Sequence, residues 1–163
     1  NRKLVALNSP QRGDVMVFRF PSDPGTNFIK RVVGLPGDKL AYRNKQLHIN
    51  GEPVPQAPRG DYTYSENNGA GGHMLFTRRL RETLNGKEHD ILLSEGTGPG
   101  LQEFTIPEGQ YFVMGDNRDR SNDSRYWGTV PEENVVGRAF LICFSWDTVN
   151  GGVAWKRIGN SIE

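Results

Sequence analysis

The residues of this 163-residue chain that could do chemistry lie in two stretches, one around a lysine and one rich in charged and hydroxyl side chains. In the first stretch, Lys30 lies within an apolar strand-like segment, between Phe28 and Val32 on the same predicted face. Desolvation by apolar neighbours favours the neutral amine, which can act as a general base. A lysine whose chain extends from an edge strand into water is the alternative interpretation.

The second stretch is the segment 115–125, GDNRDRSNDSR, which contains three aspartates and three arginines. Ions are buried in proteins only when they are paired and hydrogen-bonded. The pattern therefore indicates a loop whose charges neutralise one another and hold a hydroxyl group in place. A solvated, turn-rich loop is the alternative. A calcium loop is excluded, because Arg118 and Arg120 would occupy ligand positions of an EF-type loop starting at Asp116.

Metal or histidine chemistry has little support in the sequence. The three histidines, His48, His73 and His89, lie away from the strongly apolar strands, and no HxH, HExxH or paired-cysteine spacing occurs. The single cysteine, Cys143, excludes an intrachain disulfide. We therefore expect no metal and no cofactor.

Composition narrows the class of protein further. The net charge of +1 gives no indication of the strongly basic surface that binds nucleic acid. Twenty glycines and ten prolines favour many turns and short strands over helices. The longest apolar run, 139–144, is far shorter than the roughly 20 residues of a membrane helix. We expect a β-rich chain with no nucleic-acid partner.

Runs of apolar residues predict strands on both sides of a less regular middle section. The expected strands are 15–20, 27–33, 40–42, 46–49, 111–114 and 135–142. Apolar periodicity is weak between 51 and 102, a section that we expect to tolerate changes of length. The predicted fold is mainly β, with short strands in a barrel-like or sandwich-like arrangement. The predicted core is 1–38 with 108–163, and 39–107 is an inserted β-rich, loop-rich subdomain.

Three segments resemble, in the same order, the signature boxes of bacterial type I signal (leader) peptidases. They are 12–18 (RGDVMVF), 28–38 (FIKRVVGLPGD) and 115–125 (GDNRDRSNDSR). The resemblance implies a predominantly β serine-protease fold unrelated to chymotrypsin. It also implies a serine endopeptidase that removes signal peptides from exported preproteins after Ala-x-Ala-type sites. Such an enzyme acts at the outer, periplasmic side of the bacterial cytoplasmic (inner) membrane.

The resemblance also assigns roles to individual residues. Lys30 corresponds to the general base of a Ser-Lys dyad, and Ser121 to a hydroxyl that hydrogen-bonds and orients its amine. Asp123 and Arg125 correspond to an ion pair that shapes the loop. Further structural support is expected from Asp116, Arg118 and Arg31. The edge to which an extended substrate adds as a strand is expected at Asn27, Phe28 and Ile29.

One family motif has no counterpart in this sequence. The family's nucleophile lies in a Ser-Met-x-Pro motif upstream of the segment that begins here at Arg12, and neither that motif nor an N-terminal membrane anchor is present. We expect the chain as given to be inactive without the segment that carries the nucleophile. The alternative is a non-catalytic relative that binds extended peptides at the membrane surface. A self-cleaving repressor protease is a weaker alternative, because no DNA-binding helix pair is present.

The expected partners follow from the resemblance. They are the signal peptides of exported preproteins and a membrane lipid surface, and the protein is expected to be a monomer. Trp146 and Trp155 lie among Asp, Asn and Gly residues. Indoles favour the bilayer interface, so both are candidates for lipid contact, and capping of the core is the alternative.

Overall fold

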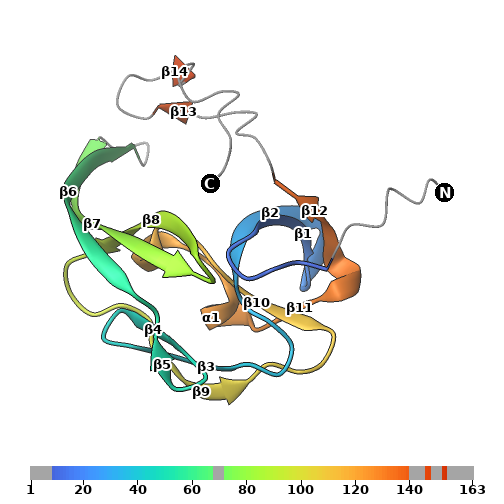
Figure 1. Ribbon diagram of the computed structural model, residues 1–163. Coiled ribbons are helices and arrows are strands. Elements are labelled where there is room, and N and C mark those ends of the chain that lie inside the picture. Colours follow the sequence, from blue (N-terminus) through green and yellow to red (C-terminus); the bar gives the residue numbers. More distant parts are fainter. Residues whose placement is uncertain (1–8, 68–71, 140–145, 148–151, 154–163) are drawn as a thin grey trace.

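The computed structural model describes residues 9–67, 72–139, 146–147 and 152–153. Among these residues strands dominate, which confirms the predicted mainly β fold (Figure 1). Cys143, Trp155 and the side chain of Trp146 lie outside the described part, as does the end of the strand expected at 135–142.

The first and last thirds of the chain meet in one five-stranded sheet, called here the central sheet. Its strands in order are β11 (Val130–Pro131), β10 (Gln110–Met114), β2 (Asp23–Gly34), β1 (Val15–Phe20) and β12 (Val135–Arg138). Every pairing in this sheet is antiparallel. β2 begins four residues before the predicted start, because it continues past the apolar segment into an exposed turn that leads back to β1.

A second sheet of four short strands follows β2. In order they are β5 (Glu52–Pro53), β4 (Gln46–Ile49), β3 (Lys39–Arg43) and β9 (Leu101–Thr105). Asn44 and Lys45 connect β3 to β4 with φ angles of 50° and 63°. Two central residues with positive φ match the right-handed twist of a tight hairpin. This confirms the hairpin expected from the sequence.

The third sheet is called here the inserted sheet, and its individual strands were not predicted from the sequence. It consists of β6 (Gln56–Asn67), β7 (Gly72–Leu84) and β8 (Lys87–Ser94). The outer halves of β6 and β7 are largely exposed, with Met74 and Phe76 at 58% and 70% exposure. A strand with little burial on either face has no apolar alternation to detect, which explains the weak pattern.

Two hydrophobic clusters cover the two faces of the central sheet. The first contains Met16, Phe18, Val32, Tyr111, Val113 and Val130. The second contains Val33, Leu40, Tyr42, Leu47, Val54, Leu84, Ile106, Phe112 and Met114. Alternate residues of β10 enter opposite clusters, so this strand is buried on both faces. Because the second cluster draws residues from all three sheets, the strands within 39–107 share a core with the central sheet.

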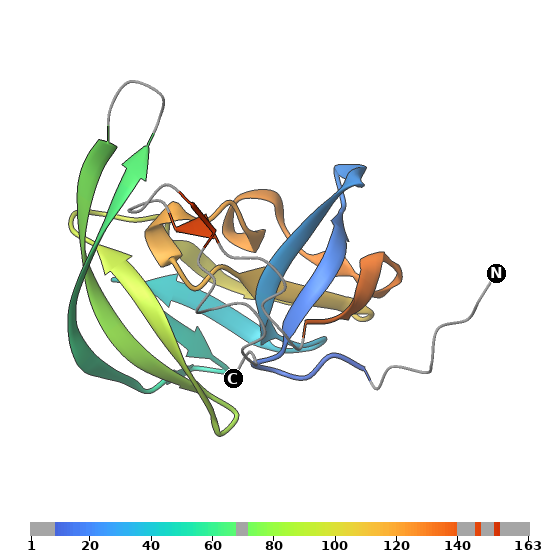
Figure 2. The same ribbon diagram turned by 90° about the horizontal axis from the view of Figure 1, so that it is seen from above.

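The remaining described elements are short. They are the 3₁₀ helices η1 (Arg118–Arg120) and η2 (Glu132–Asn134), the helix α1 (Ser124–Trp127), and the strand pair β13 (Trp146–Asp147) and β14 (Gly152–Val153). Figures 1 and 2 both show the inserted sheet on one side and β1 with β2 on the other. The segment that contains α1 lies between them, so the predicted polar loop is positioned to contact both.

Candidate active site

The centre of the site is a hydrogen bond between Lys30 and Ser121. Lys30 lies on β2 opposite Met16 of β1, and its Nζ atom lies 2.9 Å from Ser121 Oγ. The same nitrogen lies 5.7 Å from the centre of the Phe28 ring. The lysine is half-buried, and Ser121 is 9% exposed. The two sequence stretches that could do chemistry therefore meet at these two side chains.

Burial lowers the pKa of Lys30 below the ordinary lysine value. The negative charge of Asp123 acts in the opposite direction, the positive charge of Arg125 adds to the decrease, and Asp116 opposes it. Desolvation disfavours the charged ammonium form, whereas neighbouring carboxylates favour it. The net result is an amine that loses its proton more readily than a solvated lysine, as a general base requires.

Gly115 permits the close approach of the polar loop, residues 115–125, to β2. A β-carbon at this position would lie 2.5 Å from Ser121 Cβ, closer still to Ser121 Oγ, and 3.6 Å from Lys30 Nζ. Any larger residue would displace the hydroxyl. The Gly115 amide also donates a 3.0 Å hydrogen bond to Asp123 Oδ2. Sequence reasoning assigned no role to this glycine, although its place after a buried strand was a possible signal.

Asp123 and Arg125 form the ion pair that the resemblance implies, and both side chains are fully buried. Arg125 Nε and Nη2 each lie 2.8 Å from an Asp123 oxygen. Asp123 also caps α1 by accepting a hydrogen bond from the Arg125 amide. Arg125 Nη2 donates to the Arg118 carbonyl as well, and its guanidinium lies 5.1 Å from the centre of the Tyr42 ring. The pair thus closes the loop on itself.

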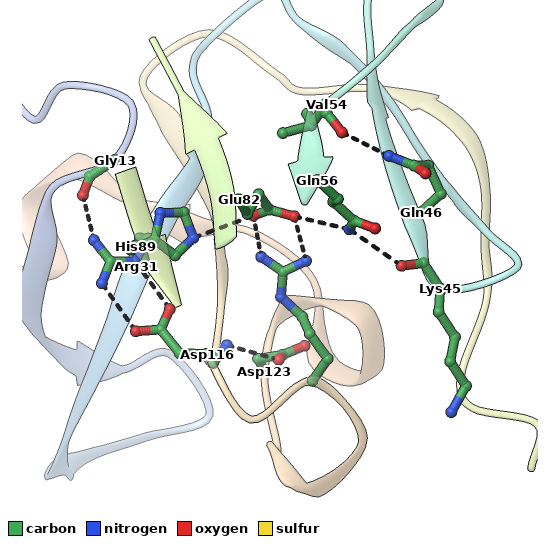
Figure 3. A network of polar contacts seen from close by, with 12 residues as sticks. Gly13, Arg31, Lys45, Gln46, Val54, Gln56, Glu82, His89, Asp116 and Asp123 are labelled. Carbon is green, nitrogen blue, oxygen red and sulfur yellow. Dashed lines mark hydrogen bonds and ion pairs between the residues drawn. The ribbon is translucent and has the colours of Figure 1, made fainter. Parts of the chain in front are cut away.

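Arg31 joins the polar loop to the turn before β1. Its Nε and Nη2 atoms lie 2.9 Å from the two oxygens of Asp116, and Nη1 donates to the Gly13 carbonyl at 2.8 Å (Figure 3). Arg31 is almost fully buried, whereas the Asp116 side chain is 41% exposed. A bidentate pair fixes direction as well as distance. Three parts of the chain are therefore held together beside Lys30.

Arg118 pairs with Glu82, a residue of β7 that sequence reasoning did not single out. Arg118 Nη1 lies 2.9 Å from Glu82 Oε2, and Nη2 bonds to the other oxygen. Burial alone would raise the pKa of Glu82, but the charge of Arg118 and hydrogen bonds from His89 and Arg118 lower it to about 2. Figure 3 shows His89 and Gln56 approaching the same carboxylate. An ionised carboxylate only accepts hydrogen bonds, so Nε2 of His89 carries the hydrogen.

The residues expected to bind substrate lie on one free edge of β2. β10 pairs with β2 only from Arg31 to Gly34, so in the described part no strand covers that edge from Asn27 to Lys30. Asn27 is exposed, Phe28 packs against the first hydrophobic cluster, and Ile29 is 60% exposed. An unpaired edge next to Lys30 can accept an extended peptide as an added strand.

Neither a metal centre nor a membrane span is found in the described residues. They contain no group of three or more His, Cys, Asp or Glu side chains arranged to hold a metal ion. None of their helices has the length and apolar character needed to cross a membrane.

The structure shows a mainly β fold in which a half-buried lysine meets a loop serine, and comparison with known proteins identifies the family. Residues 1–145 match the family described as "Signal peptidase, peptidase S26". The chain belongs to this family.

Similar proteins include two from pseudomonads, both named signal peptidase I. The protein from Pseudomonas fluorescens is 46% identical over 159 residues, which cover 90% of this chain and 53% of that protein. The protein from Pseudomonas aeruginosa is 43% identical over 158 residues, with coverages of 88% and 52%. The chain thus spans about half the length of these curated relatives.

A solved structure has a related fold. The crystal structure of a signal peptidase I from Enterococcus faecalis V583 matches with a TM-score of 0.50 and 31% sequence identity. The match covers 82% of this chain and 99% of the crystallised chain.

Proposed function

We propose that the whole protein is a signal peptidase that cleaves exported preproteins with a serine nucleophile and Lys30 as general base. The observation that carries the proposal is the 2.9 Å hydrogen bond between Lys30 Nζ and Ser121 Oγ. It is supported by burial that lowers the pKa of this amine. A costly desolvated lysine has a clear use in proton transfer and none in simple peptide binding.

In the proposed reaction, neutral Lys30 takes the proton of a serine hydroxyl as the serine oxygen attacks the scissile carbonyl carbon. The ammonium then gives the proton to the leaving amine, and an acyl-enzyme forms. Water then attacks this ester as Lys30 accepts a proton from it, and the ammonium returns that proton to the leaving serine oxygen. The released acid, which ionises to a carboxylate, is the end of the signal peptide. Ser121 acts by directing the lysine amine toward the nucleophile.

We propose that the nucleophile lies in a Ser-Met-x-Pro motif in a segment N-terminal to Arg12 and outside this chain. The half-length match to the relatives is compatible with such a segment. The chain by itself is then inactive.

Ser121 is a second candidate nucleophile, since it already bonds to the lysine. Its 9% exposure argues against that role, because a nucleophile must reach a substrate carbonyl. Ser121→Ala separates the two assignments: residual cleavage fits an orienting hydroxyl, and complete loss fits a nucleophile.

The proposed substrate is an extended segment ending in an Ala-x-Ala-type site, bound along the free edge of β2 from Asn27 to Ile29. Backbone hydrogen bonds to an edge strand would hold it in register. The proposed place of action is the outer side of the bacterial cytoplasmic membrane, with lipid as a second partner and the protein as a monomer.

The test is cleavage of a preprotein by the full-length protein, with the new N-terminus read by mass spectrometry. Lys30→Ala should abolish cleavage. Lys30→Arg should fail as well, because a guanidinium stays protonated and cannot act as a base. Near-normal rates in either variant would rule out Lys30 as the base. Binding of the preprotein by the unaltered protein without any cleavage would instead favour the non-catalytic relative.

A further inference from the structure

The inserted part of the chain holds the polar loop at five consecutive residues. Each residue from Asp116 to Arg120 makes a hydrogen bond or ion pair to the segment 39–107. The contacts are Leu92 N to Asp116 O (3.0 Å), Asn117 Nδ2 to Tyr64 Oη (2.8 Å), Arg118 Nη1 to Glu82 Oε2 (2.9 Å), Ser94 N and Lys45 Nζ to Asp119 Oδ2 (2.8 and 2.9 Å), and Arg120 Nη1 to Glu66 Oε2 (2.7 Å). The loop that carries Ser121 is therefore positioned from outside the central sheet.

Glu82 makes the most deeply buried of these contacts. Its side chain is 0% exposed and that of Arg118 is 1% exposed, whereas Arg120 and Glu66 are 42% and 49% exposed. Gln56 Nε2 and His89 Nε2 each lie 3.2 Å from a Glu82 oxygen. The Glu82 carboxylate thus accepts hydrogen bonds from three side chains at once, and loss of either Glu82 or Arg118 would leave an uncompensated buried charge. An exposed pair contributes little.

The path from Glu82 to the amine of Lys30 is short. The Arg118 carbonyl accepts a hydrogen bond from Arg125, which pairs with Asp123. Asp123 in turn accepts from the amide of Gly115, the residue packed directly against Ser121. Movement of the Arg118 backbone would therefore be transmitted to both ends of the segment that carries Ser121.

We propose that Glu82 is a positioning residue for catalysis, which acts through Arg118 to keep Ser121 in hydrogen-bond contact with Lys30. The inference rests on the proposed function. It gives the inserted sheet a part in the reaction. A misplacement of about 1 Å at a reacting group costs on the order of 100-fold in rate. Loss of Glu82 should reduce kcat within that range and leave KM nearly unchanged.

The experiment compares Glu82→Gln with Ser121→Ala and with the double variant in the full-length protein. If Glu82 acts through Ser121, the double variant is no slower than the slower single variant, because the orienting contact is lost only once. Arg81→Gln is the matched control, since Arg81 is the neighbouring residue of β7 and pairs with Glu88 and Asp90 at the surface. Its kcat should equal that of the unaltered protein.

A second variant guards against loss of folding. Replacing both partners, as Glu82→Met with Arg118→Met, removes the charges together and is compatible with a folded core. A folded double-methionine variant should still show the reduced kcat. Unchanged kcat in folded Glu82 variants, or effects that multiply with those of Ser121→Ala, would overturn the inference. Lys30→Ala, measured alongside, separates failure of the proposed function from failure of the Glu82 inference. If Lys30→Ala remains active, the proposed function is wrong. If Lys30→Ala is inactive and the Glu82 variants are fully active, only the role of Glu82 is wrong.

Discussion

Gly115 and Ser121 lie so close together that a β-carbon on Gly115 would be 2.5 Å from Ser121 Cβ. Real β-carbons do not approach another atom to that distance, so the loop must open if any side chain is present. Gly115→Ala should therefore push Ser121 away from Lys30 and reduce kcat on the order of 100-fold, as expected for a misplacement of about 1 Å. Steady-state kinetics on the full-length protein would measure this effect.

The matched control is Gly72→Ala at the start of β7, where a β-carbon would meet nothing within 4 Å. This variant should keep its full rate. Equal rates for the two alanine variants would show that the tight packing of Gly115 does not matter for catalysis.

The pH dependence of activity should follow the pKa of Lys30. Because burial lowers this pKa, kcat/KM should rise with pH through a value below 10.5, as the amine loses its proton. The charge of Asp116 raises the pKa of Lys30. Asp116→Asn should therefore shift the rising limb toward lower pH. Asp90→Asn, which alters a carboxylate paired with Arg81, should leave the limb in place. A shift toward higher pH in Asp116→Asn would contradict the prediction.

Protonation of Glu82 should lower the free energy of unfolding in acid. Its pKa is lowered from 4.5 to about 2 in the folded state, so the ionised form is favoured by folding. This contribution is fully present above about pH 4.5 and is lost as the pH falls toward about 2. A shift of this size corresponds to on the order of 3 kcal/mol.

Urea unfolding at several pH values would measure that contribution. Glu82→Gln should lower the free energy of unfolding at pH 7. It should also make that free energy depend less steeply on pH in the acid range. Glu88→Gln, which changes an exposed partner of Arg81, should change neither. An unchanged acid slope in Glu82→Gln would refute the assignment of the low pKa.

Lipid contact by Trp146 and Trp155 is a prediction from the sequence alone. Titration with anionic vesicles should shift tryptophan fluorescence to the blue, because an indole that enters the bilayer interface leaves water. The shift should be lost in the Trp146→Ala and Trp155→Ala double variant. If the fluorescence does not shift at any lipid concentration, lipid contact by Trp146 and Trp155 is excluded.

Much of the site could be predicted from local sequence. A lysine between Phe28 and Val32 on one strand face indicated a desolvated amine, since side chains alternate along any strand. The alternating charges of 115–125 indicated a loop that pairs its own ions. Four of these charges, on Asp116, Arg118, Asp119 and Arg120, pair with residues outside the loop instead, whereas Asp123 pairs with Arg125. The inference succeeds for that last pair because neighbours in sequence are held close by the chain itself.

The role of the middle section could not be predicted in this way. Glu82 and Arg118 are 36 residues apart, and only the packing of the polar loop against β7 and β8 brings them together. A glutamate in a strand with weak apolar alternation looks like a surface residue, because sequence reports burial through pattern and not through a distant partner. The amino-acid sequence by itself determined which residues could do chemistry. The tertiary structure alone decided that the distant charge of Glu82 pairs with the polar loop. The cost of burying Glu82 is offset only after the loop has packed against the inserted sheet and brought Arg118 to it.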